Sequence, residues 1–358
     1  MRARLKDLPV LLAIVLINLA AWMATKLIYD YATYSVVLNS LERVRNLQVQ
    51  VNPQSQVIVA VIDTGIDETH PELKEHLWKN LGEVGYDSKG RLKSENGIDD
   101  DGNGFKDDVH GWDFTSSTSE VEDHHGHGTH IAGLVVGVSQ FQVQQIADNS
   151  KIKLMVLKYY DPRRLNRDAA DNTAKAIRYA VDNGAHIINY SSGGAEPSES
   201  ERQAILYALK QNVLIVAAAG NDGLKLGTSK FYPASYRLPN VLSVANSDKN
   251  FNPVKSSNYS ERFVDVAAYG HRLDSTLPHG KRGYMTGTSQ ATAVVSWMAA
   301  HLISSHPFQG NFVWVRNVLK NSGRLAKSWQ GRTETGRVAL PENLKLAIKN
   351  LNKPQKNL

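Results

Sequence analysis

The chain has 358 residues, of which 42% are hydrophobic and 21% charged, close to the averages for globular proteins. This composition excludes a wholly disordered chain and a membrane protein with many spans. The formal net charge is +6 and the basic residues form no run, so nucleic acid is not an expected partner. The absence of cysteine excludes disulfides, a cysteine nucleophile and a thiolate metal site. We expect a monomer.

An export signal is predicted over residues 1–30. Three basic residues within the first six positions precede an apolar run, Leu8–Ala24. The length of this run suits either a cleaved signal peptide or an uncleaved membrane anchor. We favour the anchor because Trp22 and Met23 occupy the place where a cleavage site of small residues is expected. Residues 31–56 are predicted to be a linker. The positive-inside rule puts this linker and the rest of the chain outside the cytoplasm. Cleavage of the signal would instead make the protein secreted.

From residue 57 onward, short β-branched runs alternate with helical segments, the pattern of a parallel sheet covered by helices on both faces. Helices are predicted over residues 170–181, from Ser198 with its S-x-x-E capping box, and from Ser289 to about His306. The order predicts an α/β fold, a three-layer sandwich with a mostly parallel central sheet, over a domain of residues 57–350. The predicted strands are Val57–Ile62, Ile152–Leu157, Ile187–Tyr190, Val213–Ala217 and Val241–Val244.

Three segments carry reactive side chains at places where a parallel sheet forms its active site. Asp63 ends an apolar strand, and His127 precedes a helix that contains small residues. Ser289 lies at a helix N-terminus, where the helix dipole favours negative charge. Each motif alone is common in a structural role, as a strand-to-turn sequence or a helix start. Their joint occurrence at compatible spacing favours a shared active site.

The blocks around these residues resemble the subtilisin family of serine proteases, whose chain order is also Asp, His, Ser. The resemblance spans about residues 57–345. Segments 216–221 and 188–194 are similar to the family's oxyanion-hole segment and its substrate-binding strand and loop. The resemblance implies a serine endopeptidase for protein or peptide substrates, with Asn221 in its oxyanion hole. It also implies a substrate-binding set of Ser191, Ser192, Gly193, Ala218, Gly220 and Phe231.

The chemistry of such a site requires these residue types together. A serine hydroxyl is a weak nucleophile, so His127 would remove the Ser289 proton during attack on a peptide carbonyl. Asp63 would hold the imidazole in the correct tautomer and stabilise its charged form. The Asn221 amide and the Ser289 N–H would stabilise the tetrahedral oxyanion before an acyl-enzyme forms. Two alternatives stay open: a catalytically silent binding module, and an ester or lipid hydrolase, for which the chain has neither an apolar lid nor a G-x-S-x-G elbow.

Residues 82–111 form a long insertion rich in Gly, Asp and Asn. Within it, oxygen-bearing side chains fall at positions 1, 3, 5 and 9 of an EF-hand-like loop, with Gly104 at position 6. His110 replaces the glutamate at position 12, which excludes an ordinary EF-hand. The spacing favours a structural calcium ion over a solvated acidic loop. The predicted ligands are Asp99, Asp101, Asn103, the Phe105 carbonyl and Asp107.

Several positions depart from the family's pattern. Gln290 stands where many relatives have Met, and segment 159–172 lacks the Gly-x-Gly edge of a second substrate-binding strand. Phe231 falls near the base of the primary specificity pocket, where a bulky ring would favour small or medium substrate side chains, although a core role explains it equally well. His130 is expected to be an interior helix residue and not a second base.

Overall fold

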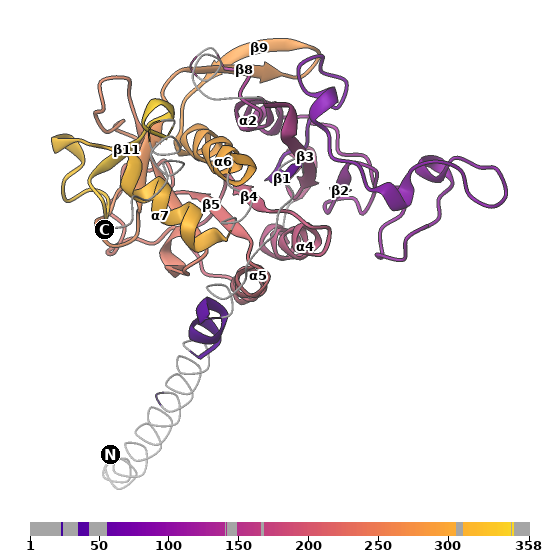
Figure 1. The fold of residues 1–358 in the computed structure, drawn as a ribbon, viewed down its shortest axis with the longest axis horizontal. Helices are drawn as coiled ribbons and strands as arrows, with labels where there is room; N and C mark the ends of the chain where they lie inside the picture. Colours follow the sequence, from indigo (N-terminus) through magenta and orange to yellow (C-terminus); the bar gives the residue numbers. More distant parts are fainter. Residues whose placement is uncertain are drawn as a thin grey trace, which may run out of the picture. The chain divides into compact units, whose positions relative to one another are not determined.

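The computed structural model divides the chain into two units, Met1–Asn46 and Leu47–Leu358 (Figure 1). In the first unit, residues 35–42 are helical, and the Ser40 hydroxyl donates a hydrogen bond of 2.6 Å to the Val36 carbonyl. Apart from residue 23, the predicted export signal lies outside the described residues. Within the described ranges, no helix is long and apolar enough to cross a membrane. The structure describes residues 23, 35–42, 56–139, 141, 149–165, 168–305, 311–344 and 346.

A nine-stranded sheet forms the centre of the second unit (Figure 1). Its order is β10-β11-β7-β6-β5-β4-β1-β3-β2, and all neighbouring strands are parallel except β10 and β11. The inner strands are buried on both faces, which is why they read as continuous apolar runs. The strands are β1 (Val57–Asp63), β2 (Gly111–Asp113), β3 (Ile152–Lys158), β4 (Ile187–Tyr190), β5 (Leu214–Ala218), β6 (Val241–Ser247), β7 (Val266–Tyr269), β10 (Arg324–Leu325) and β11 (Arg337–Ala339).

Helices cover both faces of this sheet, which confirms the predicted α/β fold. Helices α2 (His127–Val135) and α6 (Thr288–Ser305) lie on one face, and α4 (Ala169–Asp182) and α5 (Glu199–Lys210) lie on the other (Figure 1). Every residue of α6 from Thr288 to Ile303 is buried, as expected for a helix that is apolar nearly all round. Helix α7 (Phe312–Ser322) packs against α6 and β11.

The strand order reverses at β1, which lies between β3 and β4. The chain runs from β1 to β3 on one side of this strand and then crosses to β4 on the other side. In parallel sheets such a switch point opens a crevice beyond the carboxyl ends of the strands. Because Asp63 is the last residue of β1, its side chain lies where that crevice forms.

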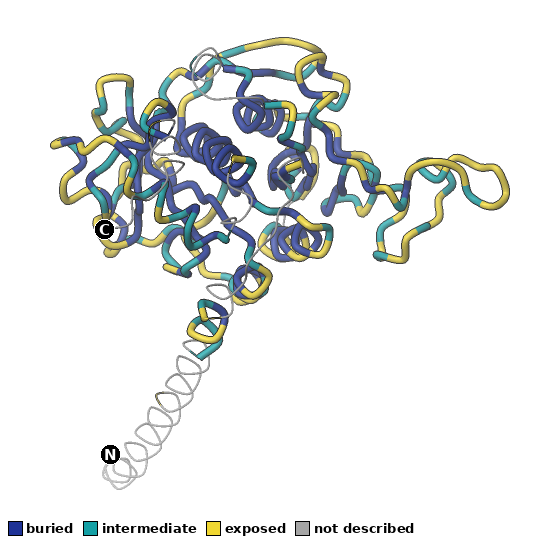
Figure 2. Tube along the Cα trace, in the orientation of Figure 1, coloured by how far each residue is buried: buried dark blue, intermediate teal, exposed yellow. Residues whose placement is uncertain are grey.

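Two features lie outside the central layers. Strands β8 (Leu273–Leu277) and β9 (Lys281–Met285) form an antiparallel hairpin, with β8 packed against α2. The insertion at residues 82–111 extends away from the sheet next to β2, and Figure 2 shows that much of it is exposed. Its only regular structure before β2 is two short 3₁₀ turns, Leu81–Glu83 and Lys93–Glu95, within the described residues.

Candidate active site

The aspartate and histidine predicted from the sequence are in direct contact. The Nδ1 atom of His127 lies 2.7 Å from Oδ1 of Asp63. This carboxylate oxygen also accepts a hydrogen bond of 2.8 Å from the Thr64 N–H. A Cβ atom on Gly128 would lie 2.0 Å from the Gly65 carbonyl oxygen, so only glycine allows α2 to approach the turn after β1 this closely. The Asp63 side chain is buried, whereas 23% of the His127 side chain is exposed to solvent.

The contact with Asp63 changes the acid–base properties of His127. Burial lowers the pKa of the imidazole because it disfavours the charged form. The negative charge and hydrogen bond of Asp63, together with the charge of Asp123, outweigh burial and leave the pKa above its ordinary value of 6.5. The pair is therefore built to stabilise an imidazolium ion.

The serine lies in the first turn of α6 and is nearly buried. Its hydroxyl donates a hydrogen bond of 2.9 Å to the Ser191 carbonyl, and the Ser191 hydroxyl donates one of 3.1 Å to the Ser289 carbonyl. Among the described residues, the Ser289 hydroxyl bonds to Ser191 and not to His127. Hydrogen bonds between a nucleophile and its base often tighten only when substrate binds, so this geometry does not exclude Ser289 as a nucleophile.

Asn221 follows β5 and reaches the N-terminus of the helix that carries Ser289. Its Oδ1 atom accepts hydrogen bonds from the Thr288 N–H, over 2.9 Å, and from the Thr288 hydroxyl, over 3.1 Å. Both bonds use the oxygen of the amide, so the Nδ2 hydrogens remain for another acceptor. Asn221 is exposed, and a negatively charged oxygen beside Ser289 could accept from it.

One residue at this site, Asp123, was missed by the sequence prediction. Its Oδ1 atom accepts a hydrogen bond of 2.8 Å from the Thr64 hydroxyl and another of 2.8 Å from the Gly126 N–H. Its Oδ2 atom accepts bonds of 2.9 and 2.7 Å from the N–H and hydroxyl of Thr129. Asp123 thus fixes the start of α2, and with it His127, to the turn after β1. An aspartate just before a predicted helix is a cap signal that could have indicated this role.

The predicted substrate-binding residues gather at the ends of two neighbouring strands. Ser191, Ser192 and Gly193 follow β4, while Ala218 ends β5 and Gly220 follows it. The two strands pair in parallel, so both sets lie at the same edge of the sheet. This edge also carries Asp63.

Phe231 lies between these two sets. A Cβ atom on Gly193 would lie 2.6 Å from the Phe231 ring, and one on Gly220 would lie 2.9 Å from it. The ring therefore fills the space between the ends of β4 and β5. The ring also packs against a buried apolar cluster, which is the core role expected for it, while its effect on substrate preference stays a prediction.

A cavity of about 260 Å³ opens beside the Asp63–His127 pair. His130 does not take part in it: the residue is fully buried in α2, and its Nε2 atom lies 3.2 Å from the Leu273 carbonyl oxygen. This is the interior position expected from the sequence. The cavity is lined by Asp63, Thr64, His125, His127, Tyr159, Tyr160, Ser191 and Ser192.

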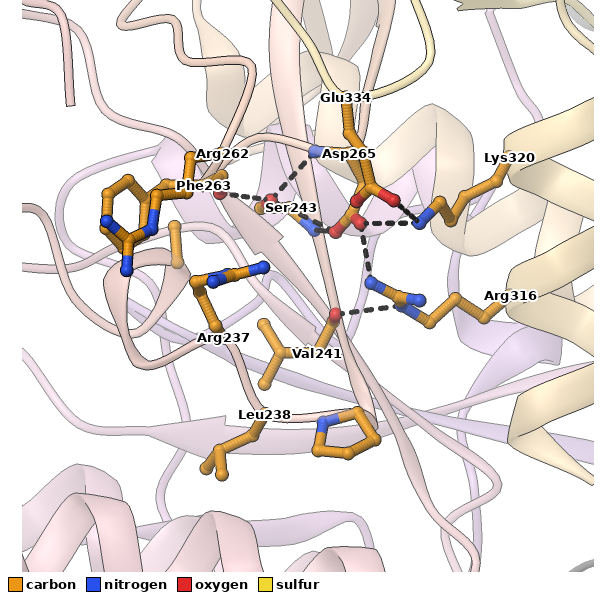
Figure 3. Close-up of a pocket in the computed structure, with 12 residues that line it drawn as sticks. Arg237, Leu238, Val241, Ser243, Arg262, Phe263, Asp265, Arg316, Lys320 and Glu334 are labelled. Atoms are coloured by element: carbon orange, nitrogen blue, oxygen red, sulfur yellow. Dashed lines mark hydrogen bonds and ion pairs between the residues drawn. The ribbon is translucent and has the colours of Figure 1, made fainter. Parts of the chain in front are cut away.

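A separate cavity of about 310 Å³ lies at the amino ends of β6 and β7, away from these residues (Figure 3). At its centre, the buried Asp265 accepts a hydrogen bond of 2.5 Å from Arg316 and one of 2.8 Å from the Ser243 N–H. Lys320 lies 3.3 Å from Asp265 and 2.7 Å from Glu334. Its buried charges are paired and it contains no histidine, so we assign it a structural role.

The acidic insertion brings only part of the predicted calcium ligand set together. Asp99 and Asp101 form a cluster with Glu83, in which one oxygen from each carboxylate lies within 4.8 Å of the others. Asp107 lies outside this cluster, because its two oxygens accept hydrogen bonds of 3.0 and 3.2 Å from the Gly97 N–H.

Asn103, a further predicted ligand, is engaged by its neighbours. The Asn103 side-chain oxygen accepts from the Phe105 N–H over 2.8 Å, and its amide nitrogen donates to Asp108 over 3.0 Å. Tyr179 and Asn80 also donate to Asp108.

Glu83 was not predicted, and it gives the cluster its strongest fit to a cation. The residue is fully buried, and its Oε2 atom has no hydrogen-bond partner among the described residues. Burial raises the pKa of this carboxyl, and the charges of Asp108 and Asp101 act in the same direction, against hydrogen bonds from two backbone N–H groups. An unpartnered buried carboxylate oxygen facing two more carboxylates is the donor chemistry that calcium prefers.

Known proteins with related sequences identify the family of the chain. Residues 54–337 match the subtilase family, peptidase S8. The chain is 31% identical over 281 residues to Subtilisin-like protease 1 of Plasmodium berghei, covering 74% of this chain and 45% of that protein. It is 32% identical over 266 residues to Thermitase of Thermoactinomyces vulgaris, covering 74% of this chain and 80% of that protein.

A solved structure, a cold adapted subtilisin-like serine proteinase, shares the fold with a TM-score of 0.62 at 20% identity, over 83% of this chain and 92% of its own. The fold is that of an α/β domain with Ser289 in the first turn of a helix that packs on a parallel sheet. The chain belongs to the subtilase family. It spans less than half the length of the Plasmodium relative.

Proposed function

We propose that this protein is a serine endopeptidase that hydrolyses peptide bonds through Ser289, His127 and Asp63. The observation that carries the proposal is the 2.7 Å contact between Asp63 and the Nδ1 atom of His127, because it leaves Nε2 as the atom that accepts a proton. Asn221 supports it, since Thr288 orients its amide beside the nucleophile.

The reaction proceeds in two halves. The Ser289 Oγ atom attacks the scissile carbonyl carbon while His127 takes the hydroxyl proton, and the Asn221 amide and the Ser289 N–H stabilise the oxyanion. When the tetrahedral intermediate collapses, the C–N bond breaks and His127 returns the proton to the leaving amine. Water then attacks the Ser289 ester, again with His127 as the base, and releases the acid product.

Labelling with a fluorophosphonate probe tests this proposal. The wild-type chain is expected to react at Ser289, and Ser289→Ala is expected to lose labelling and several orders of magnitude of peptide hydrolysis while keeping its melting temperature. Full labelling of Ser289→Ala would contradict the assignment. A wild-type chain that does not react would instead favour the silent binding module, and hydrolysis of esters without peptides would favour the other alternative.

The location of the protein is a second proposal. The basic residues ahead of the apolar run Leu8–Ala24 support an export signal that anchors the domain on the outer side of the cytoplasmic membrane. A protease added to intact cells is expected to degrade the domain, and a chain that resists until the cells are opened would contradict this location. Recovery of the domain in the medium would indicate a cleaved signal.

A structural calcium ion is part of the proposed function. Glu83, Asp99 and Asp101 would hold it, since they converge and Glu83 keeps a buried oxygen without a partner. The ion would neutralise three carboxylates and stabilise the fold of the insertion. The insertion lies between β1 and α2 in the chain, but none of its residues lines the catalytic cavity, so the ion has no step in the reaction.

A further inference from the structure

A second cavity, of about 210 Å³, adjoins the 260 Å³ cavity beside Asp63 and His127, which we call the catalytic cavity. The two cavities share Tyr159, Tyr160 and Ser192 as lining residues. A polypeptide held at Ser289 therefore reaches the second cavity with a side chain near the scissile bond. The remaining lining residues come from the loop after β4, the beginnings of α4 and α5, and the segment at Tyr232: Ala169, Ala170, Thr173, Tyr190, Gly193, Gly194, Glu196, Ser198, Glu201 and Tyr232.

This cavity contains two carboxylates and, among its described lining residues, no basic side chain. Glu201, in the first turn of α5, is buried with 5% of its surface exposed. Its Oε1 atom accepts a hydrogen bond of 2.5 Å from the Tyr190 hydroxyl, which is a neutral donor. Glu196 is exposed, so it lies closer to solvent. A buried carboxylate that has neutral donors but no cation is only partly compensated for the loss of water.

The walls of the cavity are aromatic. Tyr159, Tyr160, Tyr190 and Tyr232 all line it, and the first two have ring centroids 6.2 Å apart. The faces of tyrosine rings attract cations, and the attraction is stronger when water is excluded. Tyrosine walls with two carboxylates and no basic group form a surface complementary to an ammonium or guanidinium group. The two cavities differ in the charge of their lining, because four basic side chains line the 310 Å³ cavity.

We infer that this cavity binds the cationic side chain of an arginine or lysine in the polypeptide substrate, with Glu201 as the residue that selects the charge. The inference rests on the proposed endopeptidase activity and adds a substrate class to it. The selected residue is not the one whose carbonyl is attacked, because the family resemblance assigns that residue to a pocket at Phe231, which does not line this cavity. It is a neighbour whose side chain passes Tyr160 and Ser192.

Cleavage of a peptide library with free positions on both sides of the scissile bond tests the inference. Arginine and lysine are expected to be enriched at one position other than the residue that supplies the attacked carbonyl. A peptide with arginine at that position is expected to have a kcat/KM at least about tenfold higher than the same peptide with citrulline, which keeps the shape and loses the charge. In Glu201→Gln this ratio is expected to approach one.

Matched variants separate the possible outcomes. Glu199→Gln changes an exposed glutamate of the same helix outside the cavity, and it should keep the ratio. Glu196→Gln gives a second test if Glu201→Gln does not fold, and it should lower the ratio. Cleavage without enrichment of basic residues, or a ratio that is unchanged in both cavity variants, would overturn the inference and leave the endopeptidase assignment intact. A folded wild-type chain that cleaves no peptide and reacts with no fluorophosphonate would overturn both.

Discussion

Asn221 accepts two hydrogen bonds from Thr288, the residue that immediately precedes Ser289. The two bonds fix the amide plane with its oxygen toward Thr288, so its nitrogen is left for another acceptor. Because Thr288 itself is fully buried at the start of α6, the amide is oriented before substrate arrives. Preorganisation of this kind lets a donor stabilise developing charge without reorganising during the reaction.

Replacing Asn221 by alanine is therefore expected to lower kcat about a hundred- to a thousandfold while KM changes little. This magnitude was established by removing the oxyanion-hole asparagine of subtilisin, and we transfer it to this chain. Steady-state hydrolysis of one peptide by both proteins measures it. Fluorophosphonate labelling should persist, since Ser289 and His127 are intact. A kcat within about threefold of wild type would show that the amide does not contact the oxyanion.

The raised pKa of His127 predicts how kcat/KM depends on pH. Only neutral His127 can accept the Ser289 proton, so kcat/KM should fall as pH falls through the pKa of the free enzyme. Asp63 and Asp123 raise that pKa, so the midpoint is expected above 6.5. In Asp63→Asn the midpoint should move to lower pH, and kcat should drop about ten-thousandfold at pH 8. A rate that does not vary between pH 5 and about 8 would contradict the role of His127.

The long elements of the fold could be predicted because their sequences agree with their burial. The run that ends at Asp63 is buried on both faces, and α4 repeats small and apolar residues at helical spacing. Strands β2 and β10 could not be predicted, since they have three and two residues and are held only by pairing with neighbours. Hairpin strand β9 lacks a buried face, so no alternation of apolar residues marks it.

The site was predictable where chemistry depends on residue type and less so where it depends on packing. Asp63 ends β1, His127 begins α2 and Asn221 follows β5, so the topology places all three at the carboxyl edge of the sheet. The hydrogen bond from Ser289 to the Ser191 carbonyl depends on a side-chain rotamer, for which the sequence carries no signal. The approach of Glu83 to Asp99 depends on the path of an irregular loop.

The cap formed by Asp123 allows its positioning role to be tested. Asp123→Ala removes four hydrogen bonds at the start of α2 and one from Thr64, and it is expected to destabilise the protein by roughly 2–3 kcal/mol in urea unfolding. Asp123→Asn keeps the shape and loses the charge that helps to raise the pKa of His127. Its pH–rate midpoint should therefore move to lower pH, a change that a purely structural cap would not produce. An unchanged midpoint in Asp123→Asn would limit the residue to capping.

Calcium removal gives the last prediction. Three carboxylates within reach of one ion repel one another when no cation is present, so the folded insertion is expected to be less stable in a chelator. Calcium at about 100 times its dissociation constant would add roughly 2.7 kcal/mol if it binds only the folded chain. Differential scanning calorimetry with calcium and with excess chelator measures the shift in melting temperature. The initial rate of peptide hydrolysis should change much less than the rate of thermal inactivation.

Glu83→Gln identifies the site of this effect. The variant keeps an acceptor for the two backbone N–H groups that bond to Glu83, over 2.7 and 3.3 Å, and removes the negative charge. It is expected to lose most of the calcium-dependent shift in melting temperature. Glu95→Gln, an exposed glutamate of the same insertion, should keep the shift and serves as the control. Melting curves of the wild-type chain that coincide in calcium and chelator would refute the site, and an equal loss in both variants would show that the ion responds to the general charge of the insertion.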